Sequence, residues 1–284
     1  MERESLLTML IILLGGVMLQ MVAAWPAAHS NEASARRAER AAWLGIWWPL
    51  TPTLVVAAWL CGWALSQPDP VPDRVGPFVF IACAPFAFLV IRAIIRAAWS
   101  LFRRPEEFGI ATIGLVRPSI VFAPELAKLL DDRAIQAALE HERAHVRHRD
   151  PLRIWVAQFV TDLQWPWSRA QLRFVTWLGA LEDARDDEAR ALGIEGSDLA
   201  AAVVASLRFH RDRTVGPCAR LIGNRSALEQ RIARLLQPLP AAPQERDLSA
   251  ILAGMRLIGA LLLALALGVV YGERLIGPLL AFSS

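Results

Sequence analysis

The residues best suited to chemistry in this chain are His141, Glu142 and His145, which form the pattern HExxH. They lie within residues 133–149, a stretch whose apolar spacing predicts a helix, so the two histidines face the same side. Two imidazoles at this spacing can bind one Zn²⁺ ion, and the glutamate between them can act as a general base toward water. The pattern predicts a hydrolytic zinc centre; the alternative is three polar residues on a solvated helix face.

A third ligand is expected from a later acidic segment, because a catalytic zinc ion takes three protein ligands and keeps one position for water. Glu182 and Asp186 stand four residues apart on one predicted helix face. This spacing suits a metal ligand and a second carboxylate that orients a neighbouring ligand. Asp183 and Asp187 have the same spacing and form the competing pair. A solvated acidic patch, paired with nearby arginines, is the remaining alternative.

Two residues beyond the HExxH pattern, His148 and Asp150, are expected around the centre rather than on the ion. His148 lies about 10 Å along the helix axis from His141, too far to share one ion with it. It therefore supports the site, faces the substrate or is a plain surface residue. Asp150 could orient a histidine ligand, although its position before Pro151 also predicts the N-cap of the next helix.

The elements that position these residues are predicted to be mainly helical. Asp131 or Asp132 can cap the start of the HExxH helix, and Pro166 interrupts the chain between two later helices. The expected helices after the motif cover residues 150–164, 167–192, 197–209 and 226–236. Residues 108–124 are rich in β-branched residues and are broken by Gly and Pro, which predicts two short strands before the motif.

Long apolar runs predict a membrane protein. Apolar residues make up 55% of the chain, and the mean hydropathy is +0.37. Four runs approach the roughly 20 residues that a helix needs to cross a bilayer. They cover residues 6–25, 43–65, 76–91 and 250–271. The fourth run contains Arg256, so a buried core helix is its alternative. The expected fold class is mainly α, a polytopic α-helical membrane protein with about four spans and a small β element.

Arginines in the short loops predict the orientation. Arg36, Arg37 and Arg40 lie between the first two runs, whereas only Arg74 lies between the second and third. Because basic loops stay in the cytoplasm, we expect the long segment after the third run to be cytoplasmic and both termini to lie outside.

The predicted organisation therefore has three parts. Residues 1–102 hold three transmembrane helices, 103–246 form a cytoplasmic catalytic domain, and 247–284 hold the fourth helix and a short external tail. A cleaved signal peptide ending near Ala28 is an alternative for the first run. Against it, the run is longer than a normal signal-peptide core, and Glu2 and Glu4 take the place of the usual basic start.

Charge and cysteine content argue against two other classes. The net charge is +3 and the pI is about 9.1, but the arginines lie beside apolar runs or among carboxylates. Membrane topology explains this pattern, and direct nucleic acid binding is not expected. Cys61, Cys83 and Cys218 have no CxxC spacing, so neither a disulfide framework nor a thiolate metal site is expected.

These motifs together resemble the BlaR/MecR-type membrane metallopeptidases, the antirepressor family of bacterial antibiotic-resistance signalling. The resemblance rests on residues 114–124, 141–150, the Trp165-Pro166 break, the Glu182–Asp186 spacing and residues 228–236. It implies a gluzincin-like zinc peptidase in the bacterial inner membrane, with its catalytic domain facing the cytoplasm and Glu182 as third ligand. In the best-known members, the substrate is a transcriptional repressor.

One feature of that family is absent from this sequence. Its sensors carry a penicillin-binding domain with a Ser-x-x-Lys nucleophile, whereas the only lysine here is Lys128, with Glu125 three residues before it. No covalent binding of a β-lactam is therefore expected. The sequence ends about a dozen residues after Tyr271, so we expect an envelope partner to supply the signal.

The expected function is a membrane-embedded endopeptidase that cuts peptide bonds with metal-activated water, Glu142 acting as base. The substrate would be a protein or peptide, such as a repressor or the chain's own linker, and membrane lipid surrounds the spans. The strands could hold an extended substrate by edge pairing. Candidates for stabilising the oxyanion are His148, His210, Arg185 and Arg208. The rival functions are a non-hydrolytic membrane signal transducer that retains a structural zinc site and, on weaker grounds, a transporter.

Overall fold

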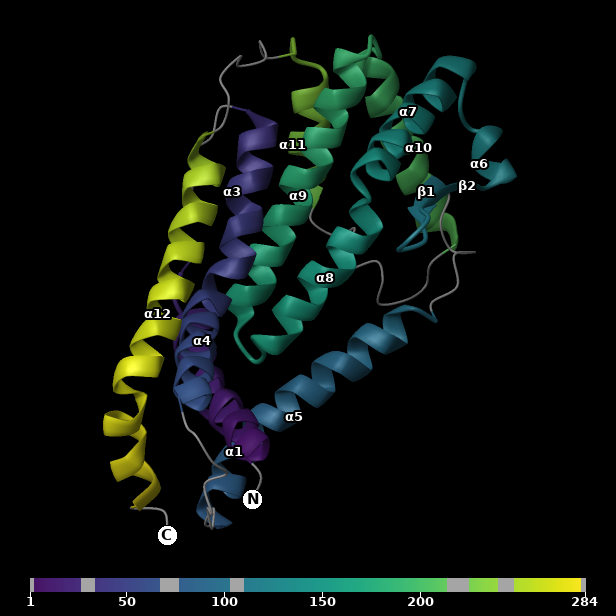
Figure 1. Ribbon diagram of the computed structural model, residues 1–284. Coiled ribbons are helices and arrows are strands. Elements are labelled where there is room, and N and C mark those ends of the chain that lie inside the picture. The colour runs from purple at the N-terminus through teal and green to yellow at the C-terminus, as the bar shows by residue number, and fades with distance from the viewer. Residues whose placement is uncertain are drawn as a thin grey trace.

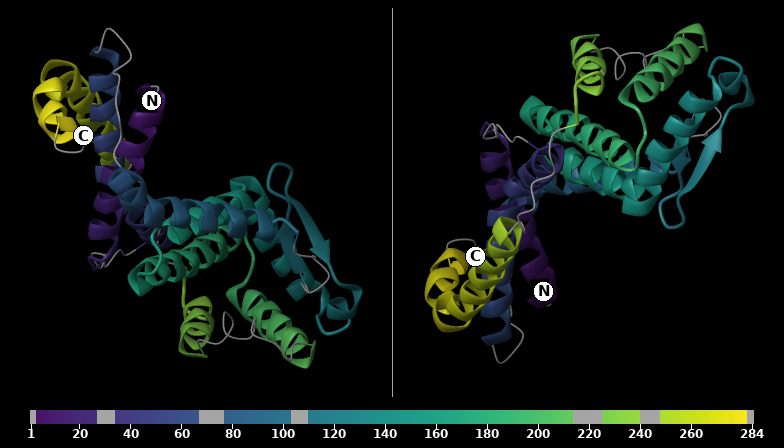
Figure 2. Two further views of the ribbon diagram at one scale, coloured as in Figure 1. Left: turned by 90° about the horizontal axis from the view of Figure 1, so that it is seen from below. Right: turned by 90° about the horizontal axis from the view of Figure 1, so that it is seen from above.

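The chain forms a mainly helical structure with one short β-hairpin (Figure 1). The computed structural model describes residues 3–26, 34–66, 77–102, 110–213, 225–239 and 248–281. Within these ranges, long apolar helices gather at one end of the molecule, and shorter amphipathic helices with the hairpin gather at the other (Figure 2). The expectation of a mainly α protein with a small β element is confirmed.

Four helices are long and apolar enough to cross a membrane. The first, Ser5–Ala23, begins at the third residue of α1 (Arg3–Leu10) and continues through a π-helical segment (Ile11–Gly15) and α2 (Gly16–Ala23). The second, Ala35–Ser66, consists of α3 (Ala35–Trp47), a 3-10 turn (Trp48–Leu50) and α4 (Thr51–Ser66). The others are α5 (Pro77–Ser100) and Leu252–Gly272 within α12 (Leu248–Ala281). Each predicted apolar run therefore corresponds to one of these helices.

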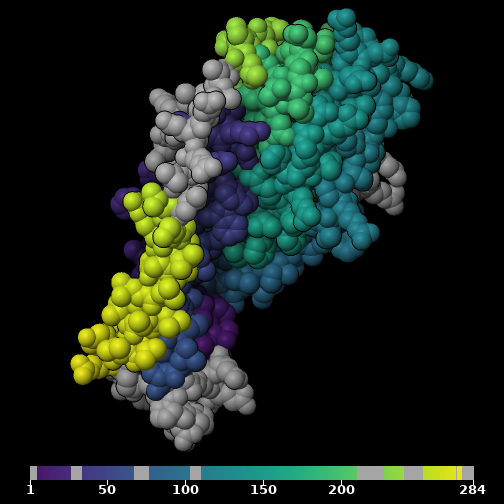
Figure 3. Space-filling model, turned by 45° about the horizontal axis from the view of Figure 1, so that its top comes forward, coloured from purple at the N-terminus to yellow at the C-terminus, as the bar shows by residue number. Residues whose placement is uncertain are grey.

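The last helix, α12, packs against α4 and exposes most of its apolar side chains (Figure 3). Two glycines allow the helix backbones to touch. A Cβ atom at Gly62 would lie 2.0 Å from the carbonyl oxygen of Leu265, and one at Gly268 would lie 2.0 Å from that of Trp59. Small residues at such crossings are typical of helices packed in membranes. Because Leu262 and its apolar neighbours are exposed, the alternative of a buried core helix is wrong.

The other end of the molecule is built around five helices and the hairpin. The helices are α7 (Asp132–His148), α8 (Asp150–Leu163), α9 (Ser168–Ala191), α10 (Gly196–Arg213) and α11 (Arg225–Leu235). Strands β1 (Ile110–Ile113) and β2 (Ser119–Phe122) pair antiparallel, with Thr112 opposite Ile120, and lead into the short α6 (Pro124–Ala127). These bounds agree with the predicted ones to within about two residues, except that α10 continues four residues past Phe209.

Helix α3 belongs to this second group by packing, although it is continuous with a candidate span. Its Ile46 is buried with Phe174 and Trp177 of α9 and with Val160 of α8, and Trp43 packs on the same core. The predicted domain boundary at residue 102 is therefore a division along the sequence only. The hydrophobic core beneath the metal-ligand candidates also includes α3, which precedes that boundary.

The corner between α7 and α8 corrects one prediction. Asp131 caps α7, accepting a hydrogen bond from the backbone N–H of Ala134 at 2.8 Å. Asp150, however, is not the N-cap of α8: that position is Arg149, whose φ of 52° lies in the left-handed region. A non-glycine residue in this region costs about 1 kcal/mol. The sharp corner turns the Asp150 carboxylate back toward α7.

Candidate metal centre

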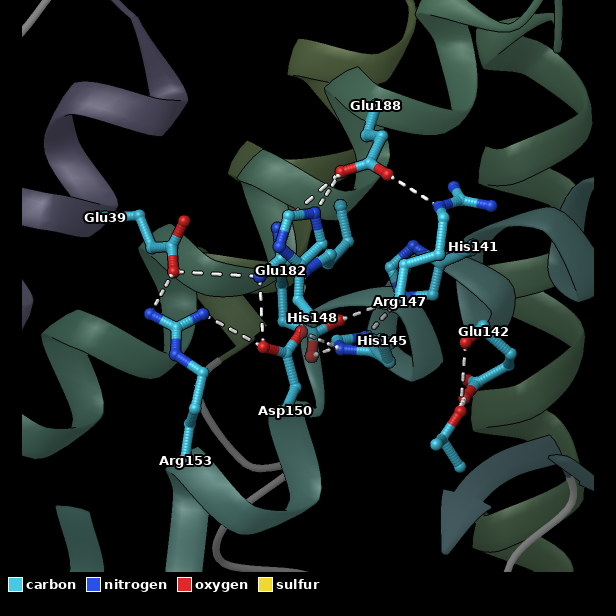
Figure 4. Close-up of polar contacts among 12 residues, drawn as sticks. Glu39, His141, Glu142, His145, Arg147, His148, Asp150, Arg153, Glu182 and Glu188 are labelled. Atoms are coloured by element: carbon cyan, nitrogen blue, oxygen red, sulfur yellow. Dashed lines mark hydrogen bonds and ion pairs between the residues drawn. The ribbon is translucent and has the colours of Figure 1, made fainter. Parts of the chain in front are cut away.

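Three side chains from two helices converge at one point (Figure 4). The Nε2 atoms of His141 and His145 lie 3.1 Å apart. The carboxylate of Glu182 lies 3.3 Å from His141 Nε2 and 3.6 Å from His145 Nε2. Ligands about 2.0–2.1 Å from a tetrahedral zinc ion are roughly 3.3–3.4 Å from one another, so the donor atoms are spaced as such a site requires. Two imidazoles and a carboxylate are also a donor set that zinc accepts.

Helix α7 buries its histidine face because small residues flank it. Ala137 and Ala144 are fully buried, which lets the neighbouring helices approach α7 closely, and both histidines are buried as well. Glu182 comes from α9, and about a third of its side chain remains exposed. The centre is therefore enclosed by protein on the histidine side and open on the carboxylate side, where water or a substrate could enter.

His145 is oriented by a buried ion pair. Its Nδ1 lies 2.8 Å from the carboxylate of Asp150, which is fully buried and also accepts hydrogen bonds from Arg185 and Arg153. Burial would raise the pKa of Asp150, but His145 and Arg185 lower it well below its usual range. A carboxylate on Nδ1 leaves Nε2 as the atom available to a metal, the arrangement by which carboxylates orient metal-binding histidines.

His141 has a matching partner in Asp186. Its Nδ1 lies 2.8 Å from the buried carboxylate of Asp186, an ion-pair distance, although the atoms do not meet hydrogen-bond geometry. Burial would lower the pKa of His141, but Asp186 and Glu182 raise that pKa to about 10. Binding of a metal ion at Nε2 would therefore displace a proton from His141.

Arg231 of α11 holds both acidic residues of this group. It donates to Asp186 at 2.7 and 2.9 Å, and its Nη1 lies 3.0 Å from Glu182. The competing pair, Asp183 and Asp187, faces elsewhere and contacts Arg234, at 3.4 and 2.5 Å. The structure therefore brings Glu182 and Asp186 to the histidines. Because Asp186 is completely buried, the segment is not a solvated acidic patch.

A longer chain of charges connects His145 to helix α3. The carboxylate of Glu39 lies 2.6 Å from Arg153, whose guanidinium contacts Asp150 at 3.0 Å. Arg153 also lies over the rings of Trp43 and Trp177, which fix it between α3 and α9. In Figure 4, Glu39, Arg153 and Asp150 succeed one another toward His145. A residue on a helix continuous with a candidate span thus takes part in orienting a ligand candidate.

Glu142 is held by the hairpin. The hydroxyl of Thr112 on β1 lies 2.7 Å from the Glu142 carboxylate and 3.0 Å from its backbone oxygen. Glu142 lies beside His141 on α7 and contacts neither Asp186 nor Arg231 among the described interactions. The hairpin thus fixes the Glu142 side chain on the same helix as the two histidines.

The other predicted residues lie away from the three donors. His148 is partly exposed and contacts Glu188 at 2.8 Å, so the structure places it in a surface ion pair. Arg185 is buried against Asp150, and Arg208 is exposed. The side chain of His210 and the whole of Cys218 lie outside the described residues.

Four residues around the centre escaped the sequence-based prediction: Thr112, Glu39, Arg153 and Arg231. Arg231 had one signal, since it lies in the segment 228–236 that carries part of the family resemblance. Glu39 had none, because an acidic residue among arginines is typical of a solvated helix.

Comparisons of the chain with protein-family models, with curated proteins and with solved structures find no match. The site must therefore be interpreted from its own geometry.

The third ligand can be tested by comparing adjacent acidic residues. We predict that Glu182→Ala removes most bound zinc, because two imidazoles alone form a poor site. Asp183→Ala, one residue away and facing Arg234, should retain it. Inductively coupled plasma mass spectrometry of the purified variants measures the zinc bound by each. If Asp183→Ala empties the site while Glu182→Ala does not, the proposed ligand set is wrong.

The charge chain to α3 gives a second prediction. Glu39→Gln should weaken zinc affinity by about tenfold, at the low end of the 10–100-fold typical of residues that orient metal ligands. Glu140→Gln, which removes a carboxylate paired with Arg143 and Arg147 on the outer face of α7, is the control and should bind zinc normally. Zinc competition titration measures both. A Glu39→Gln variant with unchanged affinity and only a lower melting temperature would show that Glu39 merely packs the fold.

Proposed function

We propose that this protein is a membrane-embedded zinc-dependent endopeptidase. The observation that carries the proposal is the convergence of His141, His145 and Glu182 at spacings suited to zinc, with Glu142 adjacent on the same helix. The partners Asp150 and Asp186 on the outer nitrogens add support, since each leaves Nε2 free toward the centre. Such orientation is what metal-binding histidines require.

The chemistry divides between the metal and the chain. When bound, a zinc ion supplies Lewis acidity, which polarises a peptide carbonyl and makes water more acidic. Glu142 takes a proton from water at its carboxylate and delivers it to the departing amine. Thr112 holds that carboxylate in place. Arg231 neutralises Asp186 and Glu182, so that both acidic groups can lie against the histidines.

The hairpin gives the substrate a place to bind. Strands β1 and β2 lie along α7, and Thr112 of β1 contacts Glu142 directly. An extended peptide added along this hairpin would run past the base, its backbone held by strand pairing and its side chains read alternately. We therefore propose an unfolded segment of a protein as the substrate, in keeping with the resemblance to the antirepressor peptidases.

We further propose that the centre faces the cytoplasm of a bacterium and acts on a cytoplasmic regulator or on a segment of this chain. Arg36 of α3 lies 3.6 Å from Glu188 of α9, so the arginine-rich start of α3 and the metal-ligand candidates are on one side of the spans. Because basic segments remain in the cytoplasm, this contact supports a cytoplasmic centre.

Single-cysteine labelling tests this orientation. In a background lacking Cys61, Cys83 and Cys218, we predict that Asp69→Cys reacts with an impermeant maleimide on intact cells, whereas Leu192→Cys reacts only after lysis. Leu192 is exposed and directly follows α9, so the protein itself does not shield it. Labelling of Leu192→Cys on intact cells would place the centre outside and exclude a cytoplasmic substrate.

Enzyme activity is tested by Glu142→Gln, which keeps the size of the side chain and removes the base. We predict that the variant binds a normal amount of zinc, because Glu142 is not a ligand. New protein N-termini created by cleavage should be found in cells with the wild-type chain and be absent from cells with the variant. N-terminal proteomics of the two strains measures this. Normal zinc content with identical N-termini in both strains would favour the non-hydrolytic transducer that retains a structural zinc site.

A further inference from the structure

We propose that the turn between α8 and α9 enters the lipid bilayer and anchors the metal centre at a fixed height above it. The membrane tip, residues 162–175, comprises the end of α8, the turn and the first two turns of α9. The inference rests on the membrane placement of the spans in the proposed function. In Figure 1, this turn lies at the lower end of α8 and α9, and α8 packs against α5.

The outer surface of the membrane tip carries four large apolar side chains among polar ones. Trp165, Trp167, Leu172 and Val175 are all exposed, and Leu172 retains 63% of its accessible surface. Their neighbours Phe174 and Trp177 face inward and are buried in the core with α3. The first half of α9 thus presents Leu172 and Val175 on its outer face, beside the exposed Arg169 and Gln171, and buries Phe174 and Trp177 on its core face.

The membrane tip is bonded to the first candidate span. Trp167 donates to the Gln20 side chain at 2.8 Å, and Gln20 donates to the backbone oxygen of Leu163 at 3.0 Å. Gln20 lies three residues before the end of α2 at Ala23, within the apolar helix itself. The turn therefore lies at the depth of the last turn of that span.

Two arginines of α9 satisfy the end of the same span. Arg173 is buried and donates to the carbonyl oxygens of Ala23 and Trp25, and Arg169 donates to that of Ala24. The last carbonyls of a helix lack partners within it, and inside a bilayer no water can replace them. These contacts allow the end of the span to lie at the membrane interface without exposed carbonyl groups.

The third candidate span encloses the membrane tip from the other side. Arg92 and Arg96 of α5 lie 3.7 and 3.0 Å from the Asp162 carboxylate, and Arg92 stacks over the ring of Trp165. Exposed Ile94, Ile95 and Trp99 follow on the same helix, so apolar surface continues beyond this pairing. The Asp162 carboxylate is thus paired with arginines of α5, while Trp165 and Trp167 are exposed near the exposed Arg169, and tryptophan and arginine are both typical of an interface between water and lipid.

Helix geometry then sets the height of the metal centre. Helix α8 runs 14 residues from Asp150 beside His145 to Leu163 in the membrane tip. At 1.5 Å per residue, the centre lies about 20 Å from the tip along this helix. The catalytic part is therefore a body seated in the lipid surface, rather than one suspended from its spans by flexible linkers.

Spin labels at three exposed leucines test the inference. Leu172→Cys lies in the membrane tip; Leu192→Cys lies about 30 Å away, directly after α9, with nearly equal exposure, 61% against 63%. Leu262→Cys lies in the middle of the α12 span. Each is made in the cysteine-free chain, labelled with a nitroxide and reconstituted in phosphatidylethanolamine–phosphatidylglycerol vesicles. An unchanged melting temperature in detergent shows that each labelled protein is folded.

The measured quantity is the rate at which each label collides with oxygen, which concentrates in lipid, divided by its rate of collision with a water-soluble nickel chelate. We expect this ratio to be several-fold higher for label 172 than for label 192, and similar for labels 172 and 262. If label 172 behaves like label 192 while label 262 remains in lipid, the inference is overturned and the spans stand. If label 172 is shielded from both reagents, a protein surface covers the tip, and the inference also fails. A water-exposed label 262 would instead refute the membrane placement itself.

Discussion

The candidate centre depends on keeping acidic groups ionised where water cannot reach them. Asp150 and Asp186 are fully buried, and each must remain charged to hold a histidine. An unpaired carboxylate in such a place would take up a proton or destabilise the fold by several kcal/mol. Arg185 and Arg153 solve this for Asp150, and Arg231 solves it for Asp186. Helices α8, α9 and α11 each contribute one of these arginines beside α7, and α3 contributes Glu39, which pairs with Arg153.

This requirement also links the centre to the candidate spans. Arg153 needs Glu39, which α3 contributes from a helix continuous with a candidate span, and the far end of α8 is bonded to Gln20 and Arg92 of two other spans. The same helix that presents Asp150 to His145 thus ends among the spans. A displacement of the spans would therefore move α8 and, through Asp150, the ring of His145. This is a physical route by which a signal from an envelope partner could reach the centre.

Sequence patterns predicted the helices well, because each has strong local signals: apolar periodicity, Asp131 as a cap, and the break at Pro166. The HExxH pair was predictable for the same reason, whereas helical spacing left Glu182–Asp186 and Asp183–Asp187 both open, and only the family resemblance favoured Glu182. The rest could not be predicted, because it depends on contacts between distant segments. Thr112 is 30 residues from Glu142, and nothing local distinguishes Glu39 from a solvated glutamate. Asp150 was predicted to be the N-cap of α8, but the left-handed backbone of Arg149 makes Arg149 the N-cap.

X-ray absorption at the zinc edge of the purified, zinc-loaded protein tests the ligand set, because it identifies ligand atoms without requiring a substrate. We predict a first shell of nitrogen and oxygen at about 2.0–2.1 Å, with the outer-shell scattering of two imidazoles. Substoichiometric zinc, a shell without imidazole scattering, or sulfur at about 2.3 Å would contradict it.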